Sequence, residues 1–230
     1  MELRCFVEHT MLKPEATEAD IAQTVDDAIR YGFFGICVAP IWVKFAHTRL
    51  SDIAPTTAVQ VVSVVGFPHG NGTTLGKVAD ANKAIECGAS EIDMVMQIGR
   101  LKSGDHKTVV TDISCVTKVC KQMGANAIKV ILETGFLSAE EIISACRLAE
   151  SAGADFVKTS TGFGPRGASV EDVQLMKTAV GTGLRIKAAG GIRTKEAAMT
   201  MIEAGACRIG TSSSVQIVTG AVEREVANAY

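Results

Sequence analysis

Three charged residues interrupt short runs of apolar residues in this sequence. Asp93 stands inside one run, Lys158 lies near the end of a second, and Lys187 occupies nearly the same place in a third. A buried charge is costly unless it is paired, neutralised or directed into a polar cavity. A single lysine in a strand usually lies at an edge, but two at matching depth with an aspartate favour a shared site. We therefore expect the three side chains to converge.

Two lysines that face one cavity can supply a nucleophile. If Lys158 and Lys187 lie on adjacent strands about 4.8 Å apart, their ammonium groups can approach to roughly 4–5 Å. At an effective dielectric constant near 20, two positive charges about 4 Å apart repel by about 4 kcal/mol. This repulsion lowers the pKa of one lysine by about three units, from about 10.4 toward 7. The neutral amine can then attack a carbonyl group and form an iminium ion, which stabilises a neighbouring carbanion.

A further pair of charges leaves two readings open. Lys129 and Glu133 lie on one face of another apolar run. They can pair with each other, or they can join the site of the other lysines.

Glycine-rich turns follow the last apolar runs of the chain. Gly190 and Gly191 follow one run, and Gly210 opens a turn that contains two serines. Glycines let backbone N–H groups approach an anion, and serines near a helix N-terminus add hydroxyl donors. These turns predict a phosphate site. Its candidate residues are Thr161, Gly162, Gly190, Gly191, Gly210, Ser212 and Ser213.

Short apolar runs and longer amphipathic stretches alternate along the whole chain, which is typical of buried strands followed by helices. The predicted strands cover residues 5–12, 34–39, 58–65, 91–97, 127–133, 155–159, 184–189 and 207–210. Helices are expected from about Thr17, Pro40, Thr74, residue 105, Ser138, Ser169 and Thr194, with a short one at the C-terminus. Thr17 and Ser138 each begin a sequence typical of a capping box.

Eight strand–helix units with short connections predict a parallel sheet that closes into a TIM (β/α)₈ barrel. The rival fold, an open doubly wound sheet, usually carries a glycine-rich turn after its first strand. The turn found there, Lys13-Pro14-Glu15, contains no glycine. In a barrel, the carboxyl ends of the strands open onto the active site, where the charged residues would meet. We expect residues 1–230 to form one α/β catalytic domain.

The composition excludes several classes of protein. The chain has 230 residues, 47% of them hydrophobic, and a formal net charge of −2. The absence of a basic block argues against a nucleic-acid or membrane partner, and no apolar run approaches the roughly 18–20 residues that span a bilayer. We find no secretory signal. Seven scattered cysteines without a CxxC motif favour reduced thiols in a cytoplasmic protein.

Together these motifs resemble the deoxyribose-phosphate aldolases, a family of class I, Schiff-base aldolases, over nearly the whole chain. Two segments are highly specific, the Lys-Thr-Ser-Thr-Gly sequence that begins at Lys158 and the Lys-Ala-Ala-Gly-Gly sequence that begins at Lys187. The other matching segments are residues 9–14, 66–70 and 91–95.

The resemblance implies reversible cleavage of 2-deoxy-D-ribose 5-phosphate to D-glyceraldehyde 3-phosphate and acetaldehyde, without a cofactor or metal. It implies that Lys158 forms the Schiff base, that Lys187 perturbs its pKa, and that Asp93 shuttles protons. It also places Thr10 and Cys37 near the reacting carbons and the glycines and serines named above around the phosphate. A homodimer or higher homo-oligomer is expected for the family.

Three positions differ from what the resemblance leads us to expect, and the last residue of the sequence is a tyrosine. Aspartate is expected where this chain has Glu8, asparagine where it has Gln97, and glycine where it has Ser214. These differences concern the pocket dimensions and the edge of the phosphate site. The terminal Tyr230 is a hypothetical proton donor.

Other functions are compatible with parts of this pattern. A phosphosugar epimerase or isomerase would need no lysine that forms an imine, and a non-catalytic phosphosugar sensor would need no paired lysines. A metal-dependent class II aldolase would need ligands, but His9, His47, His69 and His106 show no ligand spacing such as HxxxH.

Overall fold

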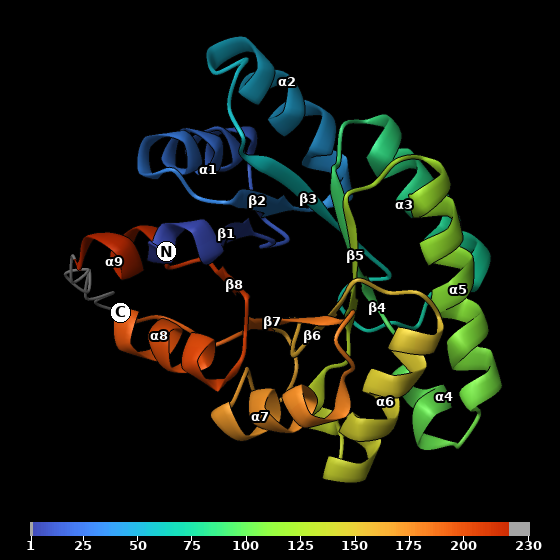
Figure 1. Cartoon of the computed structure of the whole chain (residues 1–230). Coiled ribbons are helices and arrows are strands. Elements are labelled where there is room, and N and C mark those ends of the chain that lie inside the picture. The colour runs from blue at the N-terminus through green and yellow to red at the C-terminus, as the bar shows by residue number, and fades with distance from the viewer. Residues whose placement is uncertain (1, 221–230) are drawn as a thin grey trace, which may run out of the picture.

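The computed structural model describes residues 2–220, which form a closed barrel of parallel strands inside a ring of helices (Figure 1). The strands follow one another around the barrel in chain order, and the last pairs with the first. They are β1 (Val7–Met11), β2 (Gly35–Val38), β3 (Gln60–Val65), β4 (Glu91–Val95), β5 (Ala127–Ile131), β6 (Phe156–Lys158), β7 (Arg185–Ala189) and β8 (Arg208–Thr211). The predicted TIM (β/α)₈ barrel is confirmed.

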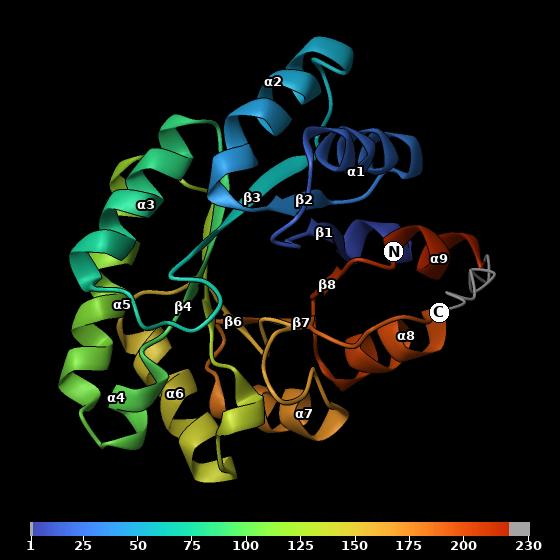
Figure 2. The same cartoon turned by 180° about the vertical axis from the view of Figure 1, so that it is seen from behind.

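Helices cover the outside of the barrel, as the view from behind also shows (Figure 2). They are α1 (Glu18–Tyr31), α2 (Val43–Ile53), α3 (Thr74–Glu86), α4 (Ile98–Lys102), α5 (His106–Gln122), α6 (Ala139–Ser151), α7 (Val170–Ala179), α8 (Lys195–Ala204) and α9 (Ser214–Thr219). Short 3₁₀ turns occupy Leu3–Phe6, Pro40–Trp42 and Thr134–Phe136. Among the described residues, none of these helices combines the length and apolar character needed to cross a membrane.

Helices α1 and α6 begin directly after the two capping residues that the sequence predicts. Thr17 and Ser138 both form capping boxes, in which the side chain of Asp20 or Glu141 accepts a hydrogen bond from the cap residue's own backbone. The predicted first strand is too long at its start, because residues 5 and 6 belong to a 3₁₀ turn. Helix α4 was not predicted, since five residues are too few to display a helical period.

The barrel separates an apolar layer from a charged interior. Residues such as Ile36, Ile92 and Ile186 point outward and are buried under the helices. The alternate residues point inward, and several of these are charged and buried. Lys158 and Lys187 are register partners on β6 and β7. The strands therefore carry both lysines to one level of the interior.

A second buried ion pair lies outside the barrel, between α3 and α5. The ammonium group of Lys77 is 2.6 Å from a carboxylate oxygen of Asp112 and donates to the Val95 carbonyl oxygen at 2.8 Å. The other Asp112 oxygen accepts from Thr74 at 2.8 Å and from Gln97 at 3.1 Å. Burial lowers the pKa of Lys77, and Asp112 opposes that shift. Gln97 thus contributes to the packing of the helices at the end of β4.

We expect Asp112→Ala to lower the free energy of unfolding by about 3–5 kcal/mol, because it leaves the Lys77 ammonium group buried without its counter-ion. Urea unfolding measures this loss. A double variant, Lys77→Met with Asp112→Leu, removes both charges and should recover much of the stability. A single variant within about 1 kcal/mol of the wild type would contradict this description of the pair.

Candidate active site

Asp93, Lys158 and Lys187 meet inside the barrel, as their positions in the sequence predict. The Nζ atoms of Lys158 and Lys187 lie 2.9 and 2.7 Å from the same oxygen of Asp93, Oδ2. The three residues come from β6, β7 and β4, respectively. One carboxylate oxygen therefore holds two lysines side by side.

The other oxygen of Asp93 belongs to a third lysine. The Lys129 ammonium nitrogen lies 2.7 Å from Asp93 Oδ1 and 2.6 Å from Glu91 Oε2. Lys129 therefore joins the cluster around Asp93 and does not pair with Glu133, which resolves the alternative left open by the sequence. Glu133 instead accepts hydrogen bonds from Thr161.

Glu8 extends the cluster toward β8. One oxygen of Glu8 accepts from Lys187, and the other lies 3.0 Å from the guanidinium group of Arg208. Arg208 also lies 3.4 Å from Glu91, and its guanidinium carbon stacks 3.3 Å above the ring of Phe34. The position where aspartate is expected thus carries a carboxylate that links Lys187 to Arg208.

The resulting ion-pair network has an unequal number of charges. Its members are the carboxylates of Glu8, Glu91 and Asp93 and the basic groups of Lys129, Lys158, Lys187 and Arg208. Three negative groups against four positive ones leave one surplus positive charge when every member is ionised. The loss of one proton from one lysine would make the network neutral.

The network favours the charged state of two carboxylates, Glu8 and Asp93, and of two lysines, Lys129 and Lys187. Burial alone would raise the pKa of Asp93, but Lys129, Lys158 and Lys187 outweigh it and hold the pKa well below its usual value. The pKa of Glu8 is lowered in the same way, mainly by Lys129 and Lys187 against its burial. Burial disfavours charge on Lys187 and Lys129, but the surrounding carboxylates raise the pKa of both.

Lys158 differs from the rest of the network in its access to a pocket. Of the described residues, it is the one network member that lines the cavity at the carboxyl ends of the strands. Its contact to the network is the Asp93 oxygen that it shares with Lys187. Lys158 therefore makes fewer ion contacts than Lys129 or Lys187.

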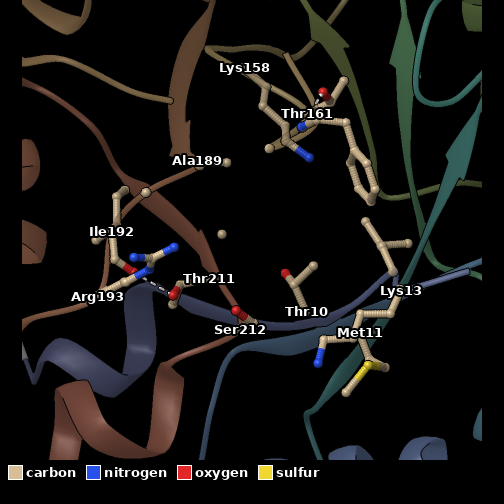
Figure 3. Close-up of a pocket in the computed structure, with 16 residues that line it drawn as sticks. Thr10, Met11, Lys13, Lys158, Thr161, Ala189, Ile192, Arg193, Thr211 and Ser212 are labelled. Atoms are coloured by element: carbon tan, nitrogen blue, oxygen red, sulfur yellow. Dashed lines mark hydrogen bonds between the residues drawn. The ribbon is translucent and has the colours of Figure 1, made fainter. Parts of the chain in front are cut away.

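The pocket has a volume of about 240 Å³, and four strand–helix connections form its wall. Figure 3 shows Lys158 on one side of the pocket, facing Thr10 and Ser212 on the other. The predicted residues that line it are Thr10, Thr161, Gly162, Gly190, Gly191, Gly210 and Ser212. The pocket thus joins the end of Lys158 to the glycine-rich turns.

Two of these glycines are required by their surroundings. Gly190 has φ +90°, and a Cβ there would lie 3.0 Å from Gly167 Cα. A Cβ on Gly210 would lie 2.9 Å from Lys187 Cε. The glycine at 210 therefore lets Lys187 pass beside β8, in addition to shaping the pocket wall.

Two of the residues predicted to bind the substrate, Cys37 and Ser213, do not line the pocket. Cys37 is buried on β2 beside Thr10, its register partner, and burial raises the pKa of its thiol to about 11. Ser213 is half-buried, and its backbone N–H donates to Thr211 Oγ1 at 3.0 Å. Ser214 is also buried and donates to the carbonyl oxygen of Thr211 at 3.0 Å. Both serines thus support the turn through hydrogen bonds to Thr211.

The sequence patterns did not identify several residues that line the pocket or belong to the network. Lys13, Phe163, Arg193 and Thr211 line the pocket, and Glu91 and Arg208 belong to the network. Glu91 and Arg208 carry the same signal that identified Asp93, because each is a charge within a strand. The Tyr230 hypothesis lies outside the described residues.

One group of potential metal ligands exists among residues 2–220. Ligand atoms of Glu8, Cys37 and Asp93 lie within 4.8 Å of one another. The carboxylate oxygens of this group already contact Lys129 and Lys187. These contacts favour ion pairing over metal binding at this position.

The lowered pKa values of Glu8 and Asp93 predict a loss of stability in acid. Below their ordinary values of 4.5 and 3.8, the unfolded chain binds more protons than the folded one. The free energy of unfolding should therefore fall as the pH drops below about 4.5. Urea unfolding between pH 7 and pH 3 measures the slope. Glu8→Gln should reduce this slope, and an unchanged slope would contradict the assignment.

Comparison with known proteins adds independent evidence. A protein described as deoxyribose-phosphate aldolase from Thermococcus gammatolerans is 55% identical over 225 residues, which cover 98% of this chain and 99% of the relative. Another with the same description, from Thermococcus kodakarensis, is 53% identical over 96% of this chain and 97% of its own length.

A solved structure extends the similarity to the fold. Deoxyribose phosphate aldolase from Aeropyrum pernix, described as having a unique tetrameric structure, superposes with a TM-score of 0.83 at 33% identity, covering 94% of this chain and 89% of its own. Residues 6–221 match the family described as DeoC/LacD family aldolase. The chain, with its lysine pair inside a closed barrel, belongs to this aldolase family.

Proposed function

We propose that this protein is a class I deoxyribose-phosphate aldolase, a carbon–carbon lyase that reversibly cleaves 2-deoxy-D-ribose 5-phosphate to D-glyceraldehyde 3-phosphate and acetaldehyde. The observation that carries the proposal is the shared oxygen of Asp93, which contacts both Lys158 and Lys187. Lys158 alone of the network reaches the pocket within the described part of the chain. Glycine-rich turns suited to a phosphate lie on the same pocket wall.

The reaction begins at the amine of Lys158. Its neutral form attacks the aldehyde carbon of the open-chain sugar, and loss of water leaves an iminium ion. A proton then leaves the 3-hydroxyl, the C2–C3 bond breaks, and its electron pair enters the iminium to give an enamine. D-Glyceraldehyde 3-phosphate departs. Protonation at C2 and attack by water on the imine carbon then release acetaldehyde and the free lysine.

The neighbours of Lys158 have separate roles in this proposal. Lys187 retains its positive charge, because Asp93 and Glu8 raise its pKa against the effect of burial. Its charge beside Lys158 disfavours a second ammonium group there. Asp93 orients Lys158 and relays protons through water during the carbinolamine and enamine steps. Thr10 lies across the pocket, where it can contact the sugar carbons (Figure 3).

The phosphate would bind at the outer part of the same pocket. Gly162, Gly190 and Gly191 line this pocket, where their backbone N–H groups would contact the anion, and Ser212 would add a hydroxyl donor. Lys13 and Arg193 also line the pocket and bring positive charge to it. A dianionic phosphate is therefore compatible with the lining.

Several broader properties complete the proposal. We assign residues 1–230 to one catalytic domain that acts on a phosphosugar and not on a nucleic acid or membrane. Lysine Schiff-base chemistry needs neither a cofactor nor a metal. Free thiols at all seven cysteines suit a cytoplasmic location. A homodimer or a higher homo-oligomer is proposed, since a relative is described as tetrameric.

Borohydride trapping with acetaldehyde tests the proposed function. We expect acetaldehyde plus sodium borohydride to inactivate the enzyme and to add one ethyl group at Lys158, because reduction fixes the imine. Peptide mass spectrometry locates the modification. Lys158→Ala should abolish both trapping and turnover, whereas Lys118→Ala, which removes an exposed lysine of α5, should retain them.

An epimerase, an isomerase or a phosphosugar sensor would not be modified under these conditions. An untrapped wild-type protein would therefore reject the proposed aldolase. Modification at another lysine in place of Lys158 would reject the assignment of the nucleophile.

A further inference from the structure

Glu133 stands at the end of β5 in a conformation that its residue type does not favour. Its backbone has φ +55° and ψ +62°, the left-handed region, and among residues 2–220 it is the one non-glycine residue with positive φ. Such a conformation costs a residue with a side chain about 1 kcal/mol or more. Glycine would avoid this cost. The presence of glutamate therefore indicates that its side chain has a role at this position.

The carboxylate of Glu133 holds the loop between β6 and α7. Its Oε2 atom accepts hydrogen bonds from the backbone N–H of Thr161, at 3.2 Å, and from the Thr161 hydroxyl. The Thr161 hydroxyl oxygen in turn accepts from the N–H of Phe163 at 3.0 Å. The glutamate, which is only 2% exposed, thus fixes the two residues on either side of Gly162.

The same loop is braced at its other end by a backbone contact. The N–H of Ala168 donates to the carbonyl oxygen of Gly190 at 3.0 Å. A Cβ on Gly167 would lie 2.2 Å from that oxygen, so the two segments touch closely. One end of the loop therefore rests on β5 through Glu133, and the other rests on the glycine turn after β7.

Glu133 itself is not part of the pocket wall. Thr161, Gly162 and Phe163 line the pocket that contains Lys158, whereas Glu133 borders a separate hollow next to His69 and Phe136. It is also absent from the ion-pair network around Asp93 within the described residues. The hydrogen bonds that connect its side chain to the pocket wall are those to Thr161.

We propose that Glu133 is a positioning residue for recognition of the substrate phosphate: its carboxylate fixes Thr161 and Phe163 so that the backbone at Gly162 faces the anion. This inference rests on the proposed function. On this inference, Glu133 contributes to the affinity for the phosphorylated part of the substrate. Imine formation at Lys158 does not depend on Glu133.

The hydrogen bonds also identify which atom of the Glu133 side chain holds the loop. Within residues 2–220, Oε1 of Glu133 has no hydrogen-bond partner, while Oε2 makes both contacts to Thr161. Glutamine can place its carbonyl oxygen at the Oε2 position and its NH₂ group at the Oε1 position. The anchor therefore requires an acceptor of this length and does not require the negative charge.

A comparison of variants at this position tests the proposal. Glu133→Gly removes the anchor and suits the left-handed backbone, so the fold should survive. We expect it to raise KM for 2-deoxyribose 5-phosphate at least about tenfold. Cleavage of unphosphorylated 2-deoxyribose and trapping of acetaldehyde at Lys158 should change less than about twofold. Glu133→Gln, the matched control, should stay within about threefold of wild-type KM.

Glu133→Asn provides a second test if the glycine variant is unstable. Asparagine tolerates the left-handed conformation, but its side chain is one methylene shorter and cannot reach Thr161 in the same way. It should reproduce the selective rise in KM. Circular dichroism and thermal unfolding confirm that each variant is folded before its kinetics are compared.

Three results would overturn the inference while leaving the aldolase intact. These are an unchanged KM in Glu133→Gly and Glu133→Asn, a glutamine variant as impaired as the glycine variant, or an equal loss of acetaldehyde trapping. A wild-type protein that neither cleaved the phosphosugar nor trapped acetaldehyde would refute the proposed function, and the inference with it.

Discussion

The structure depends on the balance of charge inside a closed barrel. Water cannot easily solvate the interior, so every carboxylate there must have a basic partner and every ammonium group an acceptor. The network around Asp93 meets this condition except for one surplus positive charge. Lys158 makes the fewest ion contacts of the lysines in this network. The proposed function assigns the nucleophile to this lysine, at the pocket.

The interior of the barrel has two levels, a buried level of charged residues and a rim of glycine-rich turns. Lys129, Lys187, Glu8 and Asp93 are fully buried and fixed by the strands, whereas the glycine turns lie at the rim, where the helices begin. Lys158 connects the levels, because it contacts Asp93 and also lines the pocket. Under the proposed function, the substrate phosphate would bind at the rim while the aldehyde reaches the buried charges. Changes in the rim turns should alter affinity more than they alter the ionisation of the network.

Sequence patterns predicted the features that depend on local or periodic signals. Alternation of strands and helices predicted the barrel, capping boxes placed the starts of two helices, and charges within apolar runs identified Asp93, Lys158 and Lys187. Contacts that depend on how the strands are staggered around the barrel could not be predicted from these local patterns. Glu8 reaches Lys187 and Arg208 across strands distant in sequence, and Glu133 bonds to Thr161 although its spacing equally permits a pair with Lys129. Helix α4 was missed because of its length.

The most direct test of this account is the protonation state of each interior lysine at neutral pH. Nuclear magnetic resonance of protein labelled with ¹³C and ¹⁵N in lysine distinguishes an amine from an ammonium group by its Cε and Nζ chemical shifts. Signals missing from Lys158→Met, Lys187→Met and Lys129→Met proteins provide the assignments. The account predicts a neutral amine at Lys158 and ammonium groups at Lys129 and Lys187 at pH 7. An ammonium group at Lys158 with a neutral amine at Lys187 would contradict it.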